Sequence, residues 1–310
     1  MRLPSFVKES SLYKTIVGYY EDKNMTIRII IALFLLLILV ILLWGPKNVR
    51  VLPTESYDYT FAGEGVPMDW VYFLNRERLD REFAITRLDD AQFVITYRRS
   101  GKYLPYIQEQ LRKRDMPSDL QYLPVIESAL REDVVSSAWA AGMWQFMPAT
   151  ARSYGLMVDE YIDERYDWQK STDAALDYLQ SLYGRFGNWT DAIAAYNRWE
   201  NGLQRDYAWQ NAAGYYDAWL NTETSRYVFR LIATKYLMED LLSYFGPEVL
   251  GDMYVLPETK TISLNWPIES LVERSEDNDY SYAEIRSLNP WIRSTYLPDG
   301  KRDIQVFRYR

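Results

Sequence analysis

Amphipathic stretches at helical spacing dominate the region between residues 100 and 245, and they limit the folds open to this chain. Apolar residues recur every three to four positions in four segments of this region, 171–186, 190–196, 206–219 and 225–243. No segment there alternates at the period of two that a half-buried strand requires. We therefore expect an all-α domain, with any ligand site in a cleft between helices.

One acid stands out inside this helical region. Glu127 follows the sequence Leu-Pro-Val-Ile and has several apolar neighbours, namely Leu120, Leu123, Val125, Ile126 and Leu130. Burial disfavours the charged form of a carboxyl group and raises its pKa, which is what a general acid needs near neutral pH. The alternative is a glutamate on the solvent-facing side of an amphipathic helix, which is the commoner place for this residue type.

Three separated segments give Glu127 a context. The first is Glu127-Ser128 together with residues 141–150, which read Ala-Gly-Met-Trp-Gln-Phe-Met-Pro-Ala-Thr. The second is the run 163–167 followed by 171–179, and the third is 186–197, which ends in Ala-Ala-Tyr-Asn. In this order and spacing the segments resemble the lytic transglycosylases of peptidoglycan, glycoside hydrolase family 23, and most of all their membrane-bound, D-type members. The resemblance covers about residues 100–245.

The resemblance implies a lysozyme-like, α-helical catalytic domain that cuts between N-acetylmuramic acid and N-acetylglucosamine without water. In that family one glutamic acid protonates the bridging oxygen, while the acetamido group of the substrate stabilises the positive charge developing at C1. The same carboxylate then takes the proton of the C6 hydroxyl, which closes a 1,6-anhydro ring. Glu127 matches this acid, and the reaction needs no cofactor and no metal.

Five further residues match positions that line the cleft of the family, and we predict all five as substrate-binding. Met143 and Gln145 match the cleft wall, where the amide contacts an N-acetyl or hydroxyl group. Tyr196 and Asn197 match the pair that faces the acid and the sugar, and Ser128 braces the backbone beside the acid. Without the resemblance, Tyr196 reads as a core residue, Gln145 as a helix-cap partner and Ser128 as a back-bonded helix residue.

The chain also departs from the family. Ala-Tyr-Asn is followed in the family by Ala-Gly-x-Gly-Asn, but residues 198–202 read Arg-Trp-Glu-Asn-Gly. Glycine permits backbone conformations and a close approach of glycan that tryptophan does not. Either Trp199 closes one end of the cleft, or Asn201-Gly202 restores a turn one position later. Further departures from the family pattern stand at Leu130, Glu132 and Trp139. Together these departures keep open a second function, in which the chain is a catalytically silent relative that binds peptidoglycan or acts as a scaffold.

The composition excludes several other chemistries. The chain has no histidine and no cysteine, which removes a Ser-His-Asp triad, a cysteine nucleophile, a Cys/His zinc site, disulfides and a lipid-modified cysteine. A net charge of −8 argues against a nucleic-acid partner. A hydrolytic lysozyme usually needs a second carboxylate across the bond. Glu132 and Asp133 follow the acid, but we expect them to be solvated loop or cap residues.

An apolar run at residues 27–44 predicts a transmembrane anchor, with residues 1–26 as a cytoplasmic leader. As a helix these ~18 residues would rise about 27 Å, enough for a bilayer core. A cleaved signal peptide is the alternative, but no small-x-small site follows the run. More Lys and Arg precede the run than follow it closely, so we expect a single-pass protein of a bacterial inner membrane whose catalytic domain faces the periplasm or cell wall.

Two other regions flank the catalytic domain. Over residues 45–99 we expect an extended tether to residue 65 and then helices over 68–98. A further helix should end near residue 115, and Ser118 should cap the helix that carries Glu127. Residues 246–310 have a β-α-α-β order that is similar to a glycan-binding LysM module. A packing module without a sugar site is the alternative.

Overall fold

The computed structural model describes residues 11, 15, 27, 30, 33–36, 58–69, 73–88, 90–246, 251–276 and 280–308. The chain divides into two units, Met1–Glu55 and Ser56–Arg310. Most of the predicted leader and of the predicted anchor at 27–44 lies outside the described residues. Among the residues that are described, no helix is both long enough and apolar enough to cross a membrane. The leader and the anchor therefore stay predictions.

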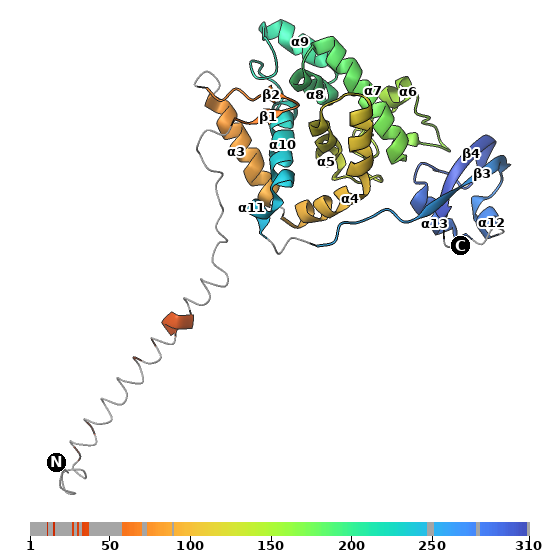
Figure 1. Cartoon of the computed structure of the whole chain (residues 1–310), viewed down its shortest axis with the longest axis horizontal. Helices are drawn as coiled ribbons and strands as arrows, with labels where there is room; N and C mark the ends of the chain where they lie inside the picture. Colours follow the sequence, from red (N-terminus) through yellow and green to blue (C-terminus); the bar gives the residue numbers. More distant parts are fainter. Residues whose placement is uncertain are drawn as a thin grey trace. The chain divides into compact units, whose positions relative to one another are not determined.

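Helices build the region that the sequence predicts to be all-α, and Figure 1 shows them in chain order. In the described part of residues 100–245, strand-like pairing is limited to isolated bridges such as Val135 with Ala141. The all-α prediction is confirmed for this region. The helices are α3 (Phe73–Leu88), α4 (Asp90–Lys113), η2 (Ser118–Tyr122), α5 (Leu123–Ser128), α6 (Pro148–Ser153), η3 (Glu164–Tyr166), α7 (Trp168–Phe186), α8 (Trp189–Arg198), α9 (Glu200–Gln210), α10 (Thr222–Glu239) and α11 (Leu241–Phe245).

Helix α10 is the central element of this domain. It contacts α3, α5, α8 and η2. A surface helix buries one apolar stripe, whereas α10 buries residues along most of its length, including Val228, Phe229, Leu231 and Ile232. Each such side chain contributes roughly 1.5–3 kcal/mol by leaving water. The helix is therefore firmly held, and side chains that it points toward α5 have fixed positions.

The first two helices divide at a different place from the one we predicted. The chain forms α3 to Leu88 and then one long helix, α4, from Asp90 to Lys113. We predicted helices over 68–98 and a further helix ending near residue 115, so the expected break after residue 98 falls inside α4. Gly101 serves a close approach, since a Cβ there would lie 2.8 Å from the carbonyl oxygen of Tyr254. The segment that leads to the C-terminal module thus passes over α4.

The helix that carries Glu127 is shorter than predicted. Residues 118–122 form the 3-10 helix η2, and α5 begins at Leu123 with Pro124 in its first turn, where no backbone donor is needed. We expected Ser118 to cap the helix that carries Glu127. It belongs to η2 instead and does not cap α5. After Ser128, Ala129 and Leu130 both take left-handed conformations, with φ of 54° and 56°. The chain therefore turns sharply at Ala129 and Leu130, directly after Ser128.

The extended tether predicted for residues 45–65 is wrong for the part that is described. Thr60–Phe61 (β1) and Glu64–Gly65 (β2) form a short antiparallel hairpin. The Glu64 carboxylate accepts a hydrogen bond from the backbone N–H of Thr190 at 2.9 Å, and Ala62 N–H donates to Asp119 at 2.8 Å. These polar contacts hold the segment on the helical domain, and glycine content alone could not predict them.

The C-terminal region has the predicted β-α-α-β order. Strands β3 (Thr259–Ile268) and β4 (Leu297–Phe307) pair antiparallel, with helices α12 (Leu271–Glu276) and α13 (Tyr282–Leu288) between them in sequence. This module shares a hydrophobic core with the helical domain through Ile162 and Tyr166. Backbone bonds join the two, including Asp163 N–H to the Trp291 carbonyl at 2.8 Å. The likeness to a LysM module stays a prediction.

Candidate active site

Glu127 lies in the last turn of α5, where that helix packs against α10. Its carboxylate accepts a hydrogen bond from the hydroxyl group of Tyr227. Tyr227 lies on α10, and two charged side chains of that helix, Glu223 and Arg230, act on the Glu127 carboxylate electrostatically. Glu223, Tyr227 and Arg230 are spaced four and three residues apart, so they share one face of α10. The acid therefore meets a set of groups that one helix presents.

Burial raises the pKa of Glu127 to about 7. Loss of solvent is the largest cause, and the negative charge of Glu223 also raises this pKa, whereas the Tyr227 hydrogen bond and the charge of Arg230 lower it. The residue is half-buried, so it stays within reach of a ligand. A carboxyl with a pKa near 7 is partly protonated and partly ionised at neutral pH, so it can both give and take a proton.

Two buried tyrosines accompany the acid. Tyr227 donates to Glu127, and the hydroxyl group of Tyr196 on α8 donates to the backbone carbonyl of Trp144 at 2.7 Å. Burial, and secondarily the charge of Glu127, raises the pKa of both phenols well above the usual value. Both tyrosines therefore keep their protons near neutral pH and act as hydrogen-bond donors. Tyr196 also ties the acid's surroundings to the loop that contains Trp144.

Ser128 connects α5 to the same loop. Its hydroxyl oxygen lies 2.8 Å from the Met143 carbonyl oxygen and 3.1 Å from that of Pro124, and it accepts from Arg131 N–H. The side chain is buried. These contacts use Ser128 to brace the backbone beside the acid, which is the role that the resemblance implied.

Arg165 fixes the loop over residues 139–146. Its guanidinium donates to the carbonyl oxygens of Trp139 at 2.7 Å and Phe146 at 3.0 Å, and it forms a buried ion pair with Asp163 at 2.6 Å. Gly142 has φ of 79°, and a Cβ there would lie 1.8 Å from the Arg165 carbonyl oxygen. The loop can therefore approach Arg165 this closely only because residue 142 is glycine.

The other predicted residues divide into two groups. Asn197 stands at the site: its Oδ1 accepts from Thr224 at 2.9 Å, and its Nδ2 donates to Glu223 at 3.2 Å. Gln145 is half-buried and uses its amide N–H groups on the loop carbonyls of Gly142 and Val134. Met143 is fully buried, so the structure places its side chain in the core and only its carbonyl near Ser128.

The sequence reasoning missed the direct partners of the acid. Tyr227 and Arg230 lie about a hundred residues from Glu127, and neither was among the predicted site residues. The Glu-Thr-Ser-Arg-Tyr-Val run at 223–228 was the available signal. The two acids that follow Glu127 have other partners: Glu132 accepts from Tyr103, and the exposed Asp133 pairs with Arg131. In the described residues no group of acidic side chains suits a metal ion.

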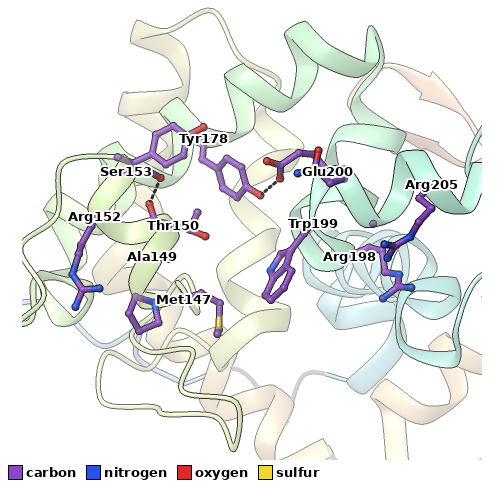
Figure 2. A pocket seen from close by; sticks show the side chains of 14 residues that line it. Met147, Ala149, Thr150, Arg152, Ser153, Tyr178, Arg198, Trp199, Glu200 and Arg205 are labelled. Atoms are coloured by element: carbon purple, nitrogen blue, oxygen red, sulfur yellow. Dashed lines mark hydrogen bonds between the residues drawn. The ribbon is translucent and has the colours of Figure 1, made fainter.

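A pocket of about 820 Å³ lies between α6, α7 and the start of α9, and Trp199 lines it. We call it the Trp199 pocket. In Figure 2 the indole of Trp199 stands between Met147 and Arg198. Trp199 takes φ of 64° at the junction of α8 and α9, while Gly202 lies inside α9. Gly202 therefore does not restore a turn, and Trp199 forms a wall of this pocket.

The Trp199 pocket and Glu127 are separate but linked. Glu127 is not among the pocket's lining residues. The ring of Tyr178, which lines the pocket, lies 5.3 Å from the ring of Tyr196, and the charge of Glu127 acts on Tyr196. Tyr178 also donates to Glu200 at 3.1 Å on the opposite wall, as Figure 2 shows. Tyr178 and Tyr196 therefore connect the Trp199 pocket to the surroundings of the acid.

Comparison with known families identifies this helical region. Residues 105–220 match the family described as Transglycosylase SLT domain. The chain carries a transglycosylase SLT domain. The family predicted from the sequence is thereby confirmed. The SLT domain match includes Glu127, Tyr196 and Trp199, whereas Tyr227 and Arg230 lie just after it.

Individual relatives support the same family. Membrane-bound lytic murein transglycosylase D of Escherichia coli strain K12 is 37% identical over 151 residues, which is 47% of this chain and 33% of that protein. The protein of the same name from Escherichia coli O6:H1 matches equally. A putative tributyltin chloride resistance protein of Alteromonas sp. strain M-1 is 37% identical over 115 residues, 36% of this chain and 56% of that protein. The chain thus matches 33% of the length of the two murein transglycosylases.

Proposed function

We propose that this chain is a peptidoglycan lytic transglycosylase and that Glu127 is its acid and its base. The observation that carries the proposal is the setting of Glu127 in an SLT domain, half-buried, hydrogen-bonded by Tyr227 and with a pKa of about 7. Two relatives named lytic murein transglycosylase, each 37% identical over the shared region, support the substrate class.

In the first step the protonated carboxyl of Glu127 gives its proton to the oxygen that joins N-acetylmuramic acid to N-acetylglucosamine. The bond from C1 to that oxygen breaks, and the acetamido group of the muramic sugar stabilises C1. The hydrogen bond from Tyr227 and the positive charge of Arg230 stabilise the carboxylate that has formed, because both favour the ionised form of Glu127.

In the second step the Glu127 carboxylate takes the proton of the C6 hydroxyl, and O6 bonds to C1. The product ends in a 1,6-anhydro ring, no water is consumed, and Glu127 is protonated again. A group that reverses its role within one turnover works best when its pKa is close to the working pH. The pKa of about 7 meets this condition.

The remaining predicted residues take supporting roles. Asn197 bonds Glu223 and Tyr196 bonds the Trp144 carbonyl, and we assign them to the sugar and to the loop respectively. Ser128, Gln145 and the carbonyl of Met143 hold the loop in place. Residues 27–44 fit a single anchor in a bacterial inner membrane, which would keep the SLT domain on the side of the cell wall.

Digestion of purified cell-wall sacculi by the full chain tests this function. The native chain should release fragments with 1,6-anhydro ends, and Glu127→Gln should lower the rate by at least ~100-fold, since acid–base catalysis supplies 10²–10⁴. Glu109→Gln, which changes an exposed helical glutamate, is the matched control and should keep the rate. Release of anhydro ends by Glu127→Gln at the native rate would refute the assignment.

A second candidate function rests on Trp199. The family has glycine at this position, and the indole here lines the pocket instead. A relative that binds peptidoglycan without cutting it is consistent with that replacement. The same digestion separates the two functions, because such a protein would bind sacculi and release nothing. Reducing ends in place of anhydro ends would indicate a hydrolytic lysozyme.

A further inference from the structure

Two tryptophans beyond the catalytic site are unusually exposed. Trp209, near the end of α9, is 83% exposed, and Trp219, in the segment before α10, is 79% exposed. They have the highest exposed fractions of the large apolar side chains in the described part of the chain. Single exposed apolar residues are ordinary, whereas apolar surface that gathers in one place marks an interaction site. Two indoles presented by one small region therefore point to a ligand.

One glutamine ties the backbone of Trp219 to the end of α9 that carries Trp209. Gln210 follows Trp209 directly, and its side-chain amide bonds the backbone of Trp219 from both sides. The amide oxygen accepts from Trp219 N–H at 2.6 Å, and the amide nitrogen donates to the Trp219 carbonyl at 3.0 Å. We call Trp209 and Trp219 the tryptophan ridge. Its geometry is set by hydrogen bonds and does not depend on contact between the indoles.

The segment under the ridge is fixed to the SLT domain. The buried carboxylate of Asp191 on α8 accepts from the Tyr207 hydroxyl at 2.6 Å and from Tyr215 N–H at 2.9 Å. Ala218 and Leu220 are buried on either side of Trp219, so the chain turns this indole outward. A binding surface that is already ordered loses little conformational entropy when a ligand arrives. The fold therefore uses several buried contacts to keep the two rings exposed.

The charges around the ridge select among possible ligands. Residues 198–223 contain four acids and two bases, which gives a net charge of −2 for this segment; they are Glu200, Asp206, Asp217 and Glu223 against Arg198 and Arg205. Anionic lipid surfaces and nucleic acids are attracted by clusters of Lys and Arg. An uncharged sugar face suits this surface better, since it packs flat against an aromatic ring while its hydroxyls stay in water.

Helix α9 joins the ridge to the Trp199 pocket. Trp199 precedes the first residue of α9 and lines the pocket, and Trp209 lies one residue before its end. Ten residues of α-helix rise about 15 Å. A polymer that leaves the pocket along α9 would therefore meet the ridge within a few sugar units.

We propose that the tryptophan ridge is a second glycan-binding surface, which holds the β-linked N-acetylhexosamine strand of peptidoglycan outside the catalytic site. The inference rests on the proposed peptidoglycan substrate. It concerns binding and makes no use of Glu127. The ridge would keep a long strand attached while the SLT domain acts on another part of it.

Binding of purified sacculi by the full chain in a detergent without a sugar headgroup tests the ridge. All chains carry Glu127→Gln so that binding is measured without digestion. Adding Trp209→Ala and Trp219→Ala should weaken co-sedimentation at least fivefold, and Phe73→Ala, which removes another exposed aromatic ring at 69% exposure, should change it less than twofold. Equal binding with and without the ridge would overturn the proposal.

Two fluorescence readouts distinguish glycan binding from lipid binding at the ridge. A fluorescein-labelled hexamer of β-1,4-linked N-acetylglucosamine should bind with a rise in anisotropy, and its dissociation constant should increase at least fivefold with Trp209→Ala and Trp219→Ala and recover partly with Trp209→Phe and Trp219→Phe. In vesicles of brominated phosphatidylglycerol, quenching of indole fluorescence that depends on the ridge would assign it to lipid and overturn the proposal. Loss of anhydro products is measured separately, so failure of the proposed catalysis leaves these binding results readable.

Discussion

The surroundings of Glu127 and the wall at Trp199 are built in different ways. Around the acid, buried groups bond to one another: Tyr227 to Glu127, Ser128 to the Met143 carbonyl, and Arg165 to Asp163. Around the pocket, Trp199 is 57% exposed and stands at a helix junction. Proton transfer needs groups at fixed positions away from water. A wall that only contacts ligand can change at the surface, where substitutions usually cost less than about 0.5 kcal/mol.

The largest expected effect is on the buried side of this comparison. Arg165→Met leaves the Asp163 carboxylate buried without its partner, so the free energy of unfolding should fall by about 3–5 kcal/mol in urea titrations. Arg131→Met breaks an Arg–Asp pair of the same spacing on the surface and should cost less than ~1 kcal/mol. Similar losses in the two variants would mean that burial does not distinguish the regions.

Glu127 itself should lower stability at neutral and higher pH. Its pKa is raised from 4.5 to about 7 by folding, so the folded chain binds an extra proton between these values. The contribution of Glu127 is full below pH 4.5, falls as pH rises through 7, and amounts to roughly 3 kcal/mol. Relative to the native chain, Glu127→Gln should gain stability between pH 5 and pH 8. A constant difference across this pH range would contradict the raised pKa.

Tyr227→Phe removes the hydroxyl that donates to Glu127. The bond lowers the pKa of Glu127, so its loss should raise that pKa and move the alkaline limb of the kcat/KM profile to higher pH. With the ionised acid less stabilised, kcat should fall about tenfold. Tyr207→Phe, which also removes a tyrosine–carboxylate bond but at Asp191, should leave the profile in place.

The smallest expected effect is at the exposed wall. Trp199→Gly relieves a positive φ at a cost of added freedom in the unfolded chain, so stability should change by less than about 1 kcal/mol. Loss of the indole contact should raise KM for sacculi severalfold and leave kcat nearly unchanged. A rise in kcat would instead show that the tryptophan obstructs the site, which favours the silent relative.

Much of the site could be predicted because local patterns carry it. The apolar spacing indicated the helices of the SLT domain, and the order of three segments assigned Glu127, Tyr196 and Asn197 to their family positions. Pairings across long stretches of chain were not predictable in the same way. Tyr227 reaches Glu127 from a hundred residues away, and no period or spacing in either segment specifies that contact.

Errors arose where one residue type has two physical uses. The predicted helix boundary after residue 98 falls inside α4, where Gly101 allows another segment to approach closely. Gly63 read as part of a tether but forms the turn of a hairpin held by Glu64. Met143 was expected to line the cleft, whereas its side chain fills the core. In each case the tertiary contact decides the role, and the sequence near the residue does not contain it.

Positions 142 and 199 should differ in the amino acids that they tolerate. With a backbone oxygen 1.8 Å from the place of a Cβ, position 142 admits a single amino acid. Every missense change in its codon should therefore displace the loop from Arg165. Position 199, where the Trp199 indole is exposed, should accept many amino acids. Over evolution, position 199 in the pocket wall should therefore vary, whereas position 142 in the loop beside the acid should stay glycine.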